Sequence, residues 1–258
     1  MHNYLVFLRK EAMELLRTKR LLGLVCVFVF FALTSPLLAR YMAEFIGALV
    51  PADEALGLVI PDPVWTDSYV QFHGNIMQIG VIALILLFMG AIASERSRGT
   101  VDLLLTKGLG HSSFILAKFT IISVALLLTM MVSMCIVYFY THTLFDTAGN
   151  VGEVFLGAAI FTLFLLLLVA LTLLAGAISK SSVVAALLSF AGFLAILGLS
   201  AIPRVGDWLP GRLSERSMEM MLEGTFHPDL WPNIGTTVLL TAVCLTLAVL
   251  ILRKREGA

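Results

Sequence analysis

The chain has 258 residues, of which 59% are hydrophobic and only 13% are charged, and its mean hydropathy is +0.99. A water-soluble domain carries about 25% charged residues, so this composition excludes that class and indicates an integral membrane protein. The 17 basic and 17 acidic residues balance, so the net charge gives no reason to expect nucleic acid as a partner.

Residues 4–20 precede the first long apolar stretch and are amphipathic. At 100° per residue Lys10, Glu14 and Arg17 point away from one apolar stripe, made of Leu5, Leu8, Ala12, Leu15 and Leu16. This pattern predicts an interfacial helix on the cytoplasmic leaflet. Two interpretations remain open: a membrane-surface anchor, or part of a docking surface for a partner that includes Lys10, Glu11 and Arg17.

Six stretches are nearly free of charge and roughly 18 to 27 residues long, enough to cross a hydrocarbon core of about 30 Å at about 1.5 Å per residue. Residues 161–171 are apolar on every face, which disfavours the alternating strands of a barrel. We therefore predict an all-α membrane protein of six spanning helices, in a single domain over residues 1–258. The predicted spans are 21–38, 75–94, 114–140, 154–178, 183–202 and 234–252.

The basic residues are distributed unevenly between the loops. Of the 17, all but Arg40, Arg204, Arg212 and Arg216 fall in the N-terminal segment, the segment after the second span, the turn at Lys180 and the C-terminal tail. By the positive-inside rule, both termini are predicted to be cytoplasmic.

Two external loops contain predicted helices. Trp65, Tyr69 and Phe72, at spacings of four and three, favour a short interfacial helix that leads directly into the second span. The loop 203–233 is long enough for one or two short helices, with Ser214 as an N-cap and Gly224 as a C-cap.

Polar and small residues in the spans have two interpretations each. Asn75 and Gln78 of the second span either line the outer part of a transport pathway or join helices by hydrogen bonds; the second interpretation is favoured. Close helix packing is the preferred interpretation for four small residues: Ala175, Ser179, Ala185 and Ser189.

Several kinds of chemistry have no support in the sequence. All five His lie outside the predicted spans, which disfavours intramembrane proteolysis, and no paired His with metal-ligand spacing occurs. The predicted spans hold no acidic residue, and their one Lys, Lys118, lies near an edge, so an ion-coupled carrier is disfavoured. We expect no catalytic residue, no metal site and no cofactor on this chain.

The segment between the second and third spans reads Ala93-Ser94-Glu95-Arg96-Ser97-Arg98-Gly99-Thr100-Val101-Asp102-Leu103-Leu104-Leu105-Thr106-Lys107-Gly108. Gly99 is predicted to end one helix in a left-handed conformation, Thr100 to cap the next, and Asp102 to lie in its first turn, where the helix dipole favours negative charge. The pattern predicts a short helix across the cytoplasmic face. An ordinary capped re-entry loop is the alternative.

This segment resembles the type-2 permeases of ATP-binding-cassette (ABC) transporters. The resemblance lies in the order of its features: Glu95, then Gly-Thr, a Leu-rich short helix, a turn, and an apolar stretch with a Lys at the entry to the third span. Arg9-Lys10-Glu11 followed by Arg17, and six spans with both ends inside, are also similar to that family. The resemblance implies a coupling helix that docks on a separate ATPase subunit. Its residues here are Glu95, Gly99, Thr100, Asp102, Leu104 and Leu105.

The resemblance further implies a bacterial plasma-membrane exporter that moves a hydrophobic or amphipathic substrate (a lipid, drug or peptide) outward. ATP and Mg would bind the partner ATPase, and a second permease, identical or different, would complete the transporter. A non-transporting membrane subunit for remodelling, sensing or immunity is the alternative. Gly108 departs from the family pattern, which has Pro after the short helix, so the turn is expected to be more flexible here.

Overall fold

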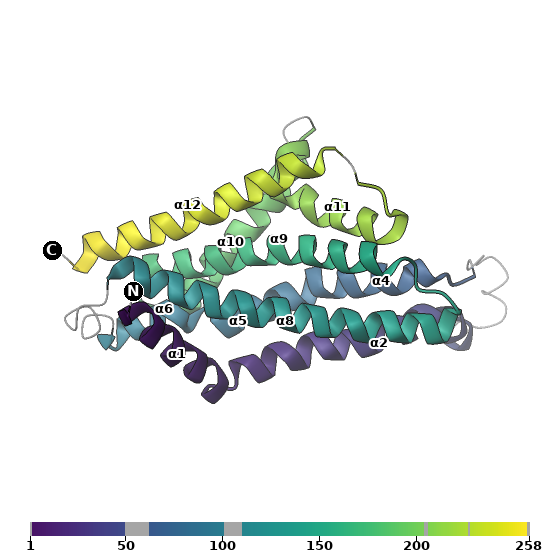
Figure 1. Ribbon diagram of the computed structural model, residues 1–258, viewed down its shortest axis with the longest axis horizontal. Helices are drawn as coiled ribbons and strands as arrows, with labels where there is room; N and C mark the ends of the chain where they lie inside the picture. The colour runs from purple at the N-terminus through teal and green to yellow at the C-terminus, as the bar shows by residue number, and fades with distance from the viewer. Residues whose placement is uncertain (1, 50–61, 101–109, 204–205, 227, 257–258) are drawn as a thin grey trace.

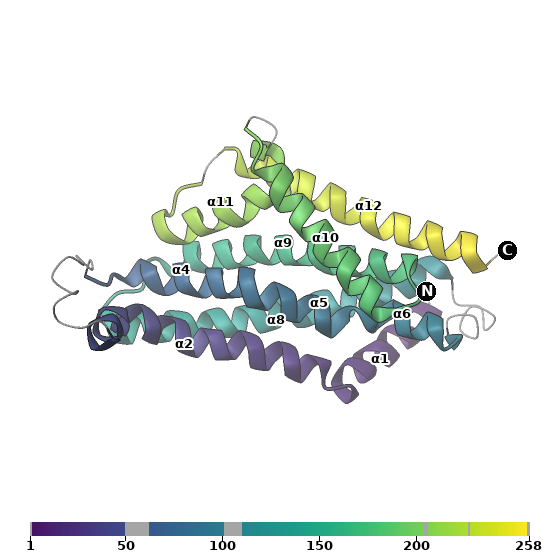
Figure 2. The same cartoon turned by 180° about the vertical axis from the view of Figure 1, so that it is seen from behind.

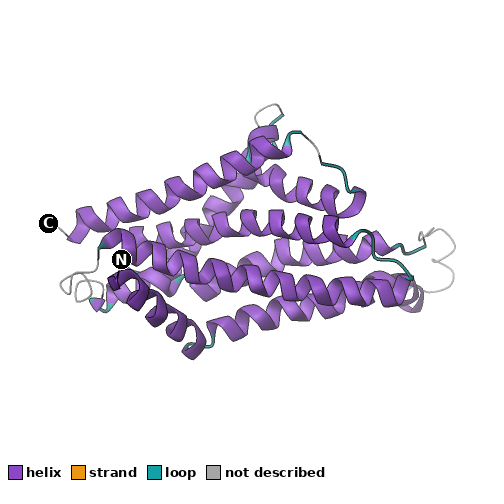
Figure 3. Ribbon diagram, in the orientation of Figure 1, coloured by secondary structure: helices purple, strands orange, loops and turns teal. Residues whose placement is uncertain are grey.

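The computed structural model describes residues 2–49, 62–100, 110–203, 206–226 and 228–256, and every regular element in these ranges is helical (Figures 1 and 3). The helices before the third span are α1 (His2–Arg17), α2 (Arg20–Leu49), α4 (Trp65–Asn75), the π-helical turn η1 (Ile76–Gly80), α5 (Val81–Phe88) and α6 (Gly90–Ser97). The others are α8 (His111–Phe145), α9 (Val151–Ile178), α10 (Ser182–Ser200), the 3-10 turn η2 (Gly206–Trp208), α11 (Pro210–Glu223) and α12 (Leu230–Glu256).

Within the described ranges, six helical segments are long and apolar enough to cross a membrane, which confirms the predicted number of spans and the all-α class. They are Arg20–Met42, Trp65–Ser97, His111–Phe145, Val151–Ile178, Ser182–Ser200 and Leu230–Lys254. The second begins ten residues before the predicted span at 75, because α4 continues through η1 into α5. The helix predicted around Trp65, Tyr69 and Phe72 is thus the N-terminal end of the second span.

Helix α9 forms the centre of the bundle and packs against α12, α11, α8 and α10, while α2 lies along α8 and α4 (Figures 1 and 2). Most of its apolar side chains are buried, including Phe161, Phe164 and Leu168. The described N- and C-terminal residues lie at the same end of the bundle, together with the end of α6 and the start of α8 (Figure 1). An even number of spans requires this arrangement of the termini.

Helix α11 turns back from α10 and lies against the N-terminal half of α9 (Figure 2). Pro210 occupies its first turn, and Gly224 ends it in the left-handed region with φ of 65°, as predicted for a C-cap. The prediction that Ser214 caps this helix is wrong, because the helix begins four residues earlier at Pro210. The Ser214 hydroxyl instead lies 2.9 Å from Nε2 of His73 in α4, which ties α11 to the second span.

Small side chains form the contact between α6, α9 and α10. Ala93, Ala175 and Ala185 make one buried cluster, and Ser189 is also buried, with its hydroxyl bonded to the Ala185 carbonyl of its own helix. The packing prediction is therefore confirmed for these residues of α9 and α10. It is wrong for Ser179, which lies at the end of α9 and bonds the Ser181 backbone.

Candidate coupling site

Glu95 lies in the last turn of α6, at the end of the second span. The helix stops there because Arg98 forms its C-cap and Gly99 has a φ of 69°, which glycine adopts at little cost. This confirms the predicted helix end at Gly99. Beside Glu95, the Arg96 guanidinium donates a 2.5 Å hydrogen bond to the Ala177 carbonyl of α9. The end of α6 is thus fixed against the central helix.

The Lys118 ammonium, in α8, joins this end of α6 to the N-terminal helix. Its Nζ lies 2.9 Å from Oε1 of Glu95 and 2.9 Å from Oε2 of Glu11 in α1. The lysine side chain is only 2% exposed, and those of Glu11 and Glu95 are 8% and 11% exposed. A buried charge is tolerated when it is paired, so the three side chains require one another.

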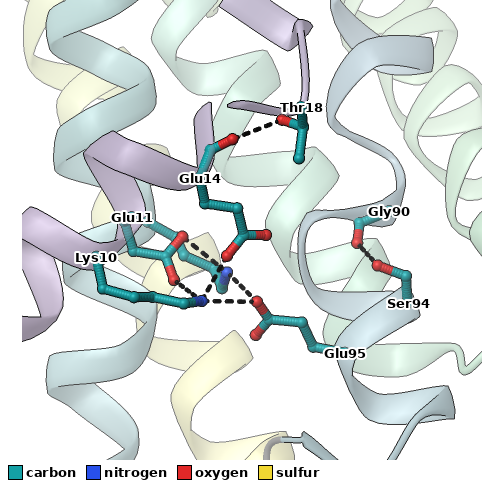
Figure 4. Close-up of polar contacts among 8 residues, drawn as sticks. Lys10, Glu11, Glu14, Thr18, Gly90, Ser94 and Glu95 are labelled. Atoms are coloured by element: carbon teal, nitrogen blue, oxygen red, sulfur yellow. Dashed lines mark hydrogen bonds and ion pairs between the residues drawn. The ribbon is translucent and has the colours of Figure 1, made fainter. Parts of the chain in front are cut away.

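Lys10 adds a second cation at the edge of the same group (Figure 4). Its Nζ lies 2.8 Å from Oε1 of Glu11, 2.5 Å from Oε2 of Glu14 and 3.2 Å from Oε1 of Glu95. We name these residues of α1, α6 and α8 the ion-pair cluster: Lys10, Glu11, Glu14, Glu95 and Lys118.

Two aromatic rings cover the cluster. The Lys10 and Lys118 ammonium groups each lie 5.1 Å from a ring centroid, of Phe7 and Phe114 respectively. The two rings contact each other, with centroids 5.6 Å apart. They exclude water from one side of the charges, which strengthens the attraction between them.

The Lys10–Glu14 contact makes one part of the cluster sensitive to acid. Burial alone raises the pKa of Glu14, but the hydrogen bond from Lys10 and the nearby positive charges lower this pKa below 4.5 overall. A carboxyl with a lowered pKa stabilises the folded state at pH values above its unfolded pKa, and this contribution is lost as the pH falls through the folded pKa.

We therefore expect the parent protein and a Glu14→Gln variant to differ by up to about 1 kcal/mol in the free energy of unfolding at pH 7. The difference should vanish as the pH falls below about 4.5. Chemical denaturation of both proteins in detergent micelles, from pH 7 to pH 3, measures it. A difference that is independent of pH would contradict the assigned contact.

The structure brings together three of the residues predicted for coupling or docking: Lys10, Glu11 and Glu95. Arg17 is exposed at the end of α1, apart from the cluster. Gly99 and Thr100 border α6, whereas Asp102, Leu104 and Leu105 lie outside the described residues. Sequence reasoning missed Glu14 and the pairing of Lys118, for which a lysine in an apolar span was the available signal.

The two predicted pathway residues have different surroundings. The Asn75 amide donates a 3.0 Å hydrogen bond to the Ser35 hydroxyl of α2, as expected for a contact between helices. Gln78 lies in η1 and its side chain is exposed. A π-helical turn contains one more residue than an α-helical turn, and such turns occur frequently at functional sites.

Six spans and a buried ionic contact at one end define a multi-pass membrane subunit. A family model described as "ABC-2 family transporter protein" matches residues 5–206. The chain therefore belongs to the ABC-2 transporter family, whose permeases are transport subunits that typically work with an ATPase. It is also 24% identical over 225 residues to the "Uncharacterized transmembrane protein YxlG" of Bacillus subtilis (strain 168), covering 85% of both chains.

Proposed function

We propose that this chain is the permease of an ATP-driven exporter, with both termini in the cytoplasm and a separate ATPase docked at the segment after α6. The ATPase holds the ATP and Mg, and this chain supplies the membrane path for a hydrophobic or amphipathic substrate. The observation that carries the proposal is the ion-pair cluster, because it joins α1 and α8 to α6 directly beside that segment.

The cluster gives the docking segment a rigid connection to the membrane helices. A push on the end of α6 acts on Glu95, and through Lys118 on α8 and on Glu11 of α1. Arg96 conveys the same displacement to α9. Glu11 is buried, so its role in this proposal is to position α1 and α8 rather than to contact the ATPase surface.

An apolar groove between α5 and α10 is evidence in favour of two parts of the proposal, the hydrophobic substrate and the second permease. It has a volume of about 340 Å³ and is lined by residues that include Ile82, Leu86, Val183 and Phe190. Gln78, Ile82 and Leu86 are spaced by four residues and exposed, so the amide of Gln78 continues the same face outward. In lipid this amide has no hydrogen-bonding partner, so a second subunit or a polar pathway is the better environment for it.

Coupling is tested with the permease and the ATPase that co-purifies with it, reconstituted in vesicles. We expect Glu95→Gln, and separately Gly99→Pro, to insert normally and to lower ATP-dependent transport about tenfold, while ATP hydrolysis continues. Gln keeps the shape of Glu95 and leaves Lys118 paired with Glu11.

Asp146→Asn, at the opposite end of α8, is the control and should transport normally. Full coupled transport by both Glu95→Gln and Gly99→Pro would refute the coupling role. ATPase binding without transport of any amphipathic substrate would instead favour a non-transporting subunit.

A further inference from the structure

The N-terminal helix has a second apolar side that no described residue covers. Its inner side is buried against the bundle through Phe7, Glu11 and Leu15. On the other side, large apolar side chains are between 46% and 64% exposed: Leu5, Val6, Met13 and Leu16. Arg9 is also exposed on this side, and a helix whose outer side combines large apolar residues with a basic one lies within the membrane surface rather than in water.

An apolar groove begins beneath this helix and runs between α2 and α8. Its volume is about 380 Å³, and its lining includes Leu15, Leu16, Val25, Val29, Val124 and Leu128. On α8 the lining extends from Ile121 to Val132, which is about 16 Å at about 1.5 Å per residue. One leaflet of a hydrocarbon core is about 15 Å thick, so the groove has the length of one leaflet.

Positive charge lies in the turn that connects two lining residues of the groove, Leu16 and Leu21. Arg17 and Lys19 are exposed at the turn between α1 and α2, and neither has an ion-pair partner within the described ranges. Lys19 has a φ of 59°, a conformation that glycine adopts at lower cost. A lysine at this position is explained if its ammonium binds an anionic group at the turn, where the groove meets the membrane surface.

We propose that the groove binds one anionic phospholipid of the cytoplasmic leaflet, with an acyl chain between α2 and α8 and the phosphate beside Arg17 and Lys19. The apolar lining, the one-leaflet length and the unpaired cations each match one part of such a lipid. The site is distinct from the groove between α5 and α10, and it rests on the cytoplasmic orientation of the basic turn.

Brominated lipids, which quench tryptophan on contact, provide the test. In a background with Trp65, Trp208 and Trp231 replaced by Phe, Val124→Trp reports on the groove. Val243→Trp on α12 is the matched control. Each valine lies 13 residues from the end of its helix at this side of the bundle, and the two are 49% and 42% exposed. The purified variants are placed in phosphatidylcholine vesicles containing brominated phosphatidylglycerol or brominated phosphatidylcholine.

We expect brominated phosphatidylglycerol to quench Val124→Trp at a mole fraction lower than that needed with brominated phosphatidylcholine, by about fivefold for each basic residue that binds the headgroup. Both lipids should quench Val243→Trp equally. Replacing Arg17 and Lys19 by Gln should abolish the preference, whereas replacing Arg253 and Lys254 should not. Equal quenching by both lipids at Val124→Trp would overturn the proposal. So would an absence of quenching at Val124→Trp when Val243→Trp is quenched, because a second protein copy would then cover the groove.

Discussion

Lys118→Met should destabilise the protein more than any other single change in the ion-pair cluster. The lysine side chain is 2% exposed, and its removal leaves the buried carboxylates of Glu11 and Glu95 with only Lys10, whose side chain is 39% exposed, as a shared cation. Breaking a buried ion pair by removing one partner costs about 3–5 kcal/mol. Chemical denaturation in detergent micelles, followed by tryptophan fluorescence, measures the loss.

Two further variants show whether the stability lost in Lys118→Met is caused by the removal of the lysine charge. Lys180→Met removes an exposed lysine at the same end of the bundle and should leave stability unchanged. The triple replacement of Lys118 by Met and of Glu11 and Glu95 by Gln removes all three buried charges, so it should recover much of the stability lost in Lys118→Met. If Lys118→Met proves as stable as the parent protein, the three side chains do not form the proposed contact.

Gly157→Leu should detach α11 from α9. A Cβ atom at Gly157 would lie 2.7 Å from the Ser217 carbonyl oxygen, a backbone atom that yields only if the helix moves. It would also lie 2.5 Å from Cγ of Met221. Overpacking costs about 1–3 kcal/mol, and moving α11 also breaks the contact between Ser214 and His73, so we expect a loss of at least about 3 kcal/mol.

Trypsin added to the outer side measures this displacement, because α11 carries Arg212 and Arg216 on its polar side. Cleavage there should be faster in Gly157→Leu than in the parent protein. Gly198→Leu is the control, since no described residue lies within 4 Å of a Cβ atom at that position in α10. Equal cleavage rates in all three proteins would show that α11 does not depend on the close approach at Gly157.

Hydrophobic length predicted the six spans correctly but placed most of their ends too far inward; the exceptions are the end of the fourth span at 178, which was correct, and that of the fifth at 202, which lies beyond Ser200. Helix α8 extends from His111 to Phe145, beyond the predicted 114–140, because backbone hydrogen bonds continue through residues that are not apolar. For the same reason, the sequence did not predict that α4 is continuous with the second span. Gly99 was predictable because a left-handed helix end is a local property of the backbone.

The ion-pair cluster was only partly predictable. Glu95 and the Lys10–Glu11 pair were recognised through a family pattern, but Lys118 lies 107 residues from Glu11 in the chain, and only the packed fold brings them together. Ser214 shows the same limit. Its type suits an N-cap, yet its function is decided by His73, which lies 141 residues away.

The π-helical turn at Ile76–Gly80 divides the second span into two mechanical parts. The outer part is anchored, since the Tyr69 hydroxyl donates a 2.8 Å hydrogen bond to the Ala148 carbonyl and His73 is held at Ser214. The inner part ends at Glu95 in the ion-pair cluster. Because a wide turn is less regular than the α-helix on either side of it, bending should concentrate there. The second span would then bend at this turn, with its outer part held in place and its inner part moving together with α1, α8 and α9, to which Glu95 and Arg96 connect it.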